Sequence, residues 1–129
     1  MTPTAAASTT TSSATTATLS AKLTVRRVTF DWADTPLHWI PGDPQSSHTI
    51  NVLHILLPAG ERWFCRVYRE ALPLVTGDAL RSDVKGFIGQ EAVHARAHTS
   101  AVEWLGRQGI DATAFSDELE RLANDRLGK

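Results

Sequence analysis

The spacing of apolar residues predicts two long helices in the middle of the chain. The first covers the segment "HTINVLHILLPAGERWFCRVYREALPLV", in which apolar residues recur at intervals of three and four. Ser46 or Ser47 precedes it as a suitable N-cap. Because proline removes a backbone donor and clashes with the preceding turn, we expect a kink or break between Pro58 and Gly60. The helix is expected to end at about 73–77.

A second helix is predicted from Asp78, placed as its N-cap, to Gly106. Its apolar residues keep the spacing of one helix face and include Val84, Phe87, Val102 and Leu105. The segment "GRQGID" then breaks the helix, and "FSDELERLANDRL" predicts a short third helix over 115–127. The predicted fold class is therefore all-α, an antiparallel helical pair with a short third helix.

An extended arm is predicted before the helices. Residues 23–30, "LTVRRVTF", are rich in β-branched residues and indicate a short strand or an extended lead-in. The following "DWADTPLHWIPGDPQSS" contains three prolines and two tryptophans. We expect these aromatic side chains to fix the arm to the helices.

Composition separates residues 1–22 from the rest. This segment is almost entirely Thr, Ala and Ser, with neither the basic nor the apolar region of a secretory signal. It lacks the apolar area that offsets ordering entropy, so we expect a disordered tail. The domain is therefore assigned to residues 23–129.

Charge and cysteine content narrow the function classes. The 129 residues suffice for one small domain, and 13 Lys plus Arg against 14 Asp plus Glu give a net charge of -1. This balance argues against a nucleic-acid partner, and no apolar run approaches the roughly 20 residues of a membrane span. Cys65 is the single cysteine, which favours a reducing cytoplasmic location and a role in the core.

Three potential ligands interrupt the apolar face of the second helix. In "FIGQEAVHARAH", Glu91, His94 and His98 continue the face, although burying a carboxylate and two imidazoles is costly unless something pairs with them. The Glu-x-x-His spacing directs both side chains toward one metal, and His98 would be a further ligand or would orient one. These donors suit iron, manganese or zinc.

Glu61 lies at the head of the first helix's apolar stripe after Pro58. In di-metal four-helix bundles, a lone Glu joins the Glu-x-x-His of another helix, and Glu61 is placed for that role. The alternative is that this face is exposed to solvent and that Glu91 and His94 form an ordinary ion pair without a metal. A zincin site is excluded because Gln90, not histidine, precedes Glu91. His54 is interpreted as a core residue or as one that orients a ligand.

The segments "HTINVLHILLPAGERWF" and "FIGQEAVHARAH" resemble the bacterial family of predicted metal-dependent hydrolases, over about Val25 to Phe115. The resemblance implies a relative of the ferritin-like di-metal bundles. It carries over Glu61, Glu91 and His94 as metal ligands, with His98 as an additional one. The implied activity is hydrolysis of a small-molecule substrate by water activated at the metal.

Members of that family resemble chains about twice as long, so this chain resembles an N-terminal half. The resemblance then implies either a homodimer or a missing C-terminal half that completes the bundle. Two other functions remain open: a di-iron carboxylate oxygenase or oxidase, and a non-catalytic helical interaction module with a partial metal site.

Overall fold

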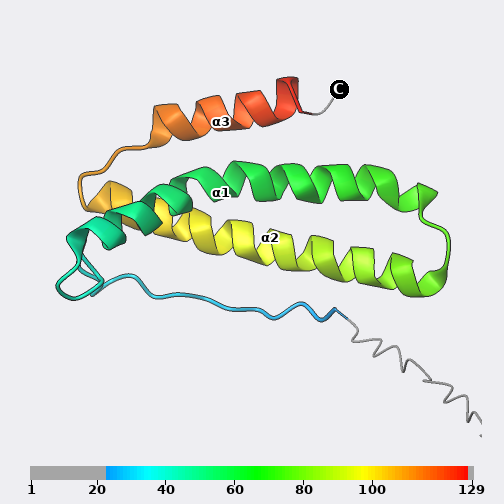
Figure 1. The fold of residues 1–129 in the computed structure, drawn as a ribbon, viewed down its shortest axis with the longest axis horizontal. Helices are drawn as coiled ribbons and strands as arrows, with labels where there is room; N and C mark the ends of the chain where they lie inside the picture. Colours follow the sequence, from blue (N-terminus) through cyan, green and yellow to red (C-terminus); the bar gives the residue numbers. More distant parts are fainter. Residues whose placement is uncertain (1–22, 128–129) are drawn as a thin grey trace, which may run out of the picture.

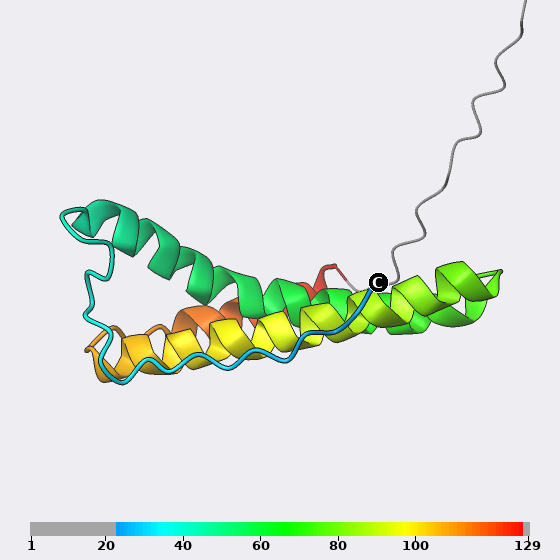
Figure 2. The same ribbon diagram turned by 90° about the horizontal axis from the view of Figure 1, so that it is seen from below.

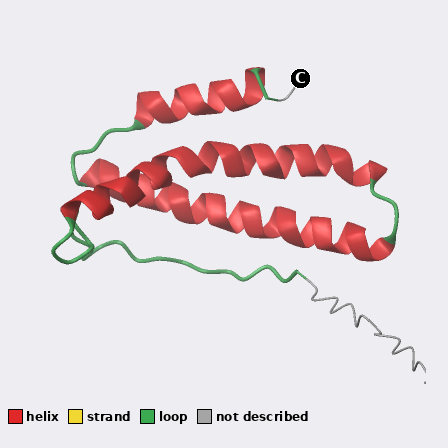
Figure 3. Cartoon of the chain, viewed as in Figure 1, coloured by secondary structure: helices red, strands yellow, loops and turns green. Residues whose placement is uncertain are grey.

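The computed structural model describes residues 23–127, and the predicted disorder of residues 1–22 lies outside the described residues. The described part is all-α, as predicted, with no strand (Figure 3). Helices α1 (Pro44–Ala71) and α2 (Asp78–Arg107) form an antiparallel pair, joined by the short 3-10 helix η1 (Leu72–Leu74). The third helix, α3 (Thr113–Asp125), packs on α1 (Figure 1).

Helix α1 begins earlier than predicted. Its N-cap is Asp43, whose carboxylate accepts a hydrogen bond from the Ser46 backbone amide at 2.9 Å. Pro44 occupies the first helical position, where its fixed φ and missing N–H are tolerated. The predicted cap at Ser46 or Ser47 is therefore wrong. Ser47 is instead buried, and its hydroxyl accepts a hydrogen bond from the Ile40 amide at 3.0 Å.

The Pro58 segment bends α1 without breaking it. The helix is continuous through Pro58 and Gly60. Figure 2 shows its C-terminal half lying along α2 and its N-terminal half diverging from α2. A proline inside a helix removes one backbone hydrogen bond and accounts for such a bend. The predicted kink is confirmed, and it places Glu61 where the two helices come together.

Helix α2 begins at the predicted residue, but Gly77, with φ 92°, takes the cap position in place of Asp78. The buried residues of α2 also form a different line along the helix from the predicted face, because Val84, Phe87 and Val102 are only half-buried. The most buried residues are Gly86, Ile88, Ala95, Ala101, Trp104 and Leu105. Gly86 on this line faces the arm, whereas the small, buried Ala95 and Ala101 leave room for close helix packing. The face that carries Glu91, His94 and His98 therefore flanks the helix contact.

The arm is extended, as one of the two predicted alternatives, and its tryptophans fix it to the helices. The Trp32 indole donates to Ser100 Oγ at 3.0 Å and stacks on the buried Trp104 at 5.4 Å between ring centroids. The Trp39 indole donates to Asn51 Oδ1 at 3.0 Å. Two regions distant in sequence are thereby joined, and the aromatic contacts predicted for the arm are confirmed.

Glycines in α2 let the arm lie against the helix (Figure 2). A Cβ atom on Gly86 would lie only 2.5 Å from the Leu23 carbonyl oxygen. The Gln90 side chain donates to the Thr24 carbonyl oxygen at 3.2 Å. A larger residue at Gly86 would therefore push this part of the arm away.

Helix α3 attaches to α1 on the side away from the arm (Figure 1). Arg62 forms an ion pair with Glu120, and the Trp63 indole donates to the Leu127 carbonyl oxygen at 3.2 Å. Cys65 is buried, which agrees with the predicted core role, and burial raises the pKa of its thiol. Within residues 23–127, no helix combines the length and apolar character that a membrane crossing requires.

Candidate metal centre

Two helices bring one carboxylate and two imidazoles together. Glu61 comes from α1, just beyond the bend, while His94 and His98 lie one turn apart on α2. One potential ligand atom from each residue lies within 4.8 Å of the other two. The predicted combination of Glu61 with the second helix is thus seen for these three side chains.

Glu61 is the buried member of this group. Its residue is 3% exposed, and Oε1 lies 2.8 Å from His94 Nδ1 and 3.7 Å from His98 Nε2. The other oxygen, Oε2, is buried and has no hydrogen-bond partner among the described residues. Burial raises the pKa of the Glu61 carboxyl; the electrostatic interaction with His94 opposes this shift, and the charge of Glu91 adds to it. An unpaired buried carboxylate oxygen is a position that a cation would satisfy.

The imidazoles form a continuous chain. His94 Nε2 lies 3.0 Å from His98 Nε2, and His98 Nδ1 lies 2.7 Å from His54 Nδ1 on α1. The His98 side chain is 12% exposed. Burial lowers the pKa of His98 to about 4, and the neighbouring imidazoles His54 and His94 add to the shift. His98 is therefore neutral at pH 7, the form that binds metal.

His54 contacts His98 from the opposite helix. If His98 presents Nε2 to a metal, its Nδ1 carries the proton and donates to His54 Nδ1. Such a bond fixes the tautomer and ring direction of a ligating histidine. His54 is half-buried and contacts His98 directly, a position that is compatible with both predicted roles.

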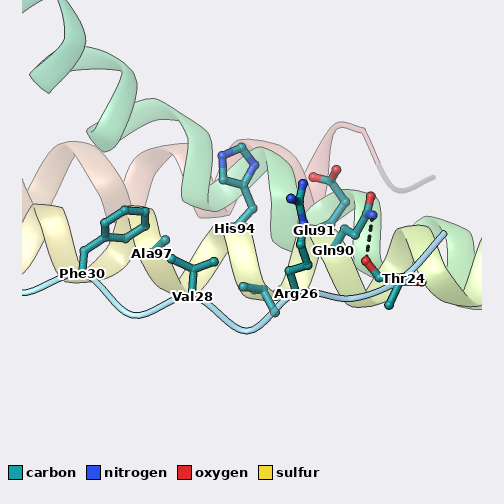
Figure 4. Close-up of a pocket in the computed structure, with 9 residues that line it drawn as sticks. Thr24, Arg26, Val28, Phe30, Gln90, Glu91, His94 and Ala97 are labelled. Carbon is teal, nitrogen blue, oxygen red and sulfur yellow. Dashed lines mark hydrogen bonds between the residues drawn. The ribbon is translucent and has the colours of Figure 1, made fainter.

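Glu91 lies outside the group of three. It is half-buried, one turn before His94, and the two side chains project to the same side of α2 in Figure 4. Its charge is close enough to raise the pKa of Glu61. Together with Arg26 it lines a cavity of ≈ 340 Å³ between α2 and the arm. The structure therefore places Glu91 beside the candidate centre and does not group it with Glu61, His94 and His98.

The arm contributes side chains that sequence spacing did not assign to the site. A second cavity, of ≈ 290 Å³, lies beside the imidazoles. Its lining comprises Phe30, Trp32, Trp39, Ile50, His54, His94, Ala97 and His98. The feature of the sequence that pointed to these contacts was the presence of two tryptophans in the proline-rich arm. That pattern predicted attachment to the helices, but not to which part of them.

A buried carboxylate and two imidazoles on adjacent helices form a donor set of the kind that binds divalent metals. The chain belongs to the family of predicted metal-dependent hydrolases, whose family model matches residues 24–129. The family expected from the sequence is thereby confirmed. Searches among curated proteins and among solved structures each found no match to the chain.

Proposed function

We propose that this protein is a metal-dependent hydrolase in which Glu61, His94 and His98 bind a divalent ion. The observation that carries this proposal is the unpaired, buried Oε2 atom of Glu61, beside two imidazoles. Without a cation, such a carboxylate is an expensive feature of a small core. Family membership supports the same function.

The chemistry of these donors fits iron, manganese or zinc, because carboxylate and imidazole suit all three. When bound, such an ion supplies Lewis acidity, which polarises a carbonyl or phosphoryl group and lowers the pKa of water. We propose Glu91 as a further carboxylate ligand. Its position one turn before His94, and its charge effect on Glu61, support this role.

The protein side chains have different exposures, which suggests different roles. Glu61 and His98 are enclosed and would anchor the ion. The His94 side chain is 58% exposed and marks the side from which a small-molecule substrate would approach. His54 holds the His98 ring in place through the Nδ1–Nδ1 contact.

We further propose that a second copy of the chain covers the open side of α1. Large apolar residues are exposed along this helix: Val52, Leu53, Leu56, Phe64 and Tyr68. Several recur at helical spacing near Glu61, so that a two-fold pairing would bury them next to the metal ligands. Sedimentation at micromolar concentration is expected to show a dimer. A well-folded monomer would contradict this arrangement.

The function is tested by metal loading and hydrolysis in parallel. The protein is stripped with a chelator and reloaded separately with iron, manganese and zinc. It is then assayed with acetate and phosphate esters of 4-methylumbelliferone. We expect hydrolysis of at least one ester that depends on metal and is lost in His94→Ala. The exposed Glu103→Gln variant serves as the control and should retain activity. Hydrolysis equal with and without metal would refute the proposal.

A further inference from the structure

The ≈ 290 Å³ cavity beside the imidazoles has a distinct chemical character. Its walls combine the arm's Phe30, Trp32 and Trp39 with Ile50 of α1 and Ala97 of α2, and the imidazoles complete it. None of the described residues that line it is an aspartate, glutamate, lysine or arginine. A bound group would therefore find apolar and aromatic surface on most sides.

The polar atoms of the tryptophans that line the cavity are already engaged. The Trp32 indole N–H donates to Ser100, and the Trp39 indole N–H donates to Asn51. The remaining polar groups of the lining are the imidazoles of the metal centre. In the metal-free protein, a charged group placed among the aromatic walls would lose its hydration without gaining an opposite charge, which is strongly unfavourable. Such a cavity selects uncharged groups.

The volume limits the size of that group. An engineered apolar cavity of about 150 Å³ holds one benzene molecule. The present cavity, at ≈ 290 Å³, is roughly twice as large and matches a fused two-ring aromatic group or a branched acyl group of similar size. Phe30 lines the cavity and is 52% exposed, so this wall of the cavity borders solvent.

The cavity that contains Glu91 and Arg26 shares Phe30, His94 and Ala97 with the apolar cavity. The two cavities therefore border the same three side chains. Figure 4 shows Phe30, Ala97 and His94 at one end of the first cavity and Glu91 and Arg26 toward the other. A molecule lying across both would place an apolar end among the tryptophans and a polar end near Arg26.

We propose that the substrate carries an uncharged aromatic or branched apolar group, bound in the cavity of Phe30, Trp32, Trp39 and Ile50, next to its reacting bond. This inference rests on the proposed hydrolase function. It adds a substrate class that neither the metal ligands nor the family model specifies. The polar portion of the same substrate would extend toward Arg26 and Glu91.

The test uses 2-naphthol as the neutral probe and 2-naphthoate as its anionic counterpart, both with chelator-treated, metal-free protein, so that a bound ion cannot attract the carboxylate. The indole N–H signals are followed by NMR. We expect 2-naphthol to shift the Trp32 and Trp39 signals. The Trp63 signal should stay in place, because Trp63 does not line the cavity and its indole bonds to Leu127 near α3. The naphthoate should bind at least about tenfold more weakly, since it would bury a carboxylate without a partner.

Two cavity-filling variants, Ala97→Leu and Ile50→Phe, should each weaken 2-naphthol binding by about tenfold or more. Two are used so that one variant that fails to fold, as circular dichroism reports, does not decide the test. The exposed Ala114→Leu on α3 is the matched control and should bind normally. Equal binding of 2-naphthol and 2-naphthoate, or the absence of Trp32 and Trp39 shifts, would overturn the inference.

Metal content measured on reloaded portions of the same preparations separates this inference from the proposed function. Stoichiometric metal without 2-naphthol binding would refute the substrate class and leave the metal-dependent function standing. If the protein binds 2-naphthol but takes up no metal on reloading, the proposed hydrolase function is refuted. The assignment of the cavity to the substrate of that hydrolase is then refuted as well.

Discussion

Replacing Glu61 with leucine separates the free-energy cost of burying the Glu61 carboxylate from the free energy that metal binding contributes. Glu61 is 3% exposed and its Oε2 atom has no partner among the described residues. Such a group costs about 1–3 kcal/mol when metal is absent. Leucine removes this cost but loses the contact with His94, which is worth up to about 1 kcal/mol because His94 is largely exposed. We expect metal-free Glu61→Leu to gain about 1–2 kcal/mol in free energy of unfolding.

The gain in free energy of unfolding of metal-free Glu61→Leu should depend on pH. Because burial raises the pKa of Glu61 above its usual 4.5, the folded protein holds this proton more tightly than the unfolded chain. The contribution of Glu61 is therefore favourable below the usual pKa and is lost as pH rises through the folded-state pKa. Leucine does not ionise, so its advantage over the wild type should grow as pH increases through this window.

Urea unfolding with a chelator present, at about pH 5 and about pH 8, measures both effects. Exposed Glu103→Leu is the control and should change stability by less than about 0.5 kcal/mol. With saturating metal the order should reverse, because only the wild type gains binding energy. If metal-free Glu61→Leu is less stable than the wild type at both pH values, the carboxylate is already satisfied within the chain and our reasoning is wrong.

Three further predictions address other parts of the molecule. His54→Ala should weaken metal affinity by about 10–100-fold in a chelator competition, while exposed His48→Ala leaves it unchanged; equal affinities would remove His54 from the centre. Hydrogen bonds from Ser46 lower the pKa of Asp43, so its capping contribution is present above its usual pKa of 3.8 and lost as pH falls. Asp43→Ala should therefore lower the melting temperature at neutral pH and much less near pH 2; a pH-independent difference would argue against the cap. Gly106→Ala, with open space at its Cβ, should stabilise the protein by about 0.5–1 kcal/mol, whereas Gly86→Ala should not, because it displaces the arm; equal gains in urea unfolding would contradict that contact.

Local sequence information was sufficient for the helices and for part of the centre. Apolar periodicity and the Pro58 and Gly77 interruptions predict the antiparallel pair, because these features act over one or two turns. The three-residue and four-residue spacings of Glu91, His94 and His98 place them on one helix face. The same reasoning applies on α1, where Glu61 lies on the stripe that meets α2.

The remaining features depend on contacts between distant segments. The buried line of α2 runs through residues such as Ala95 and Ala101, which contribute little to apolar periodicity but allow close helix packing. His54 and His98 are 44 residues apart in sequence and meet only in the folded pair. The aromatic wall of the cavity comes from an arm without periodic structure, so its position was not predictable from spacing.

The most direct test of the metal centre is the metal content of the wild type and its ligand variants after identical loading. We expect stoichiometric metal in the wild type and little or none in the Glu61→Ala, His94→Ala and His98→Ala variants, which each lose a member of the group of three. Glu91→Ala should bind clearly more weakly than the wild type, and His48→Ala should match it. Equal metal content in all of these proteins would show that the three residues brought together by α1 and α2, with Glu91 beside them, are not ligands.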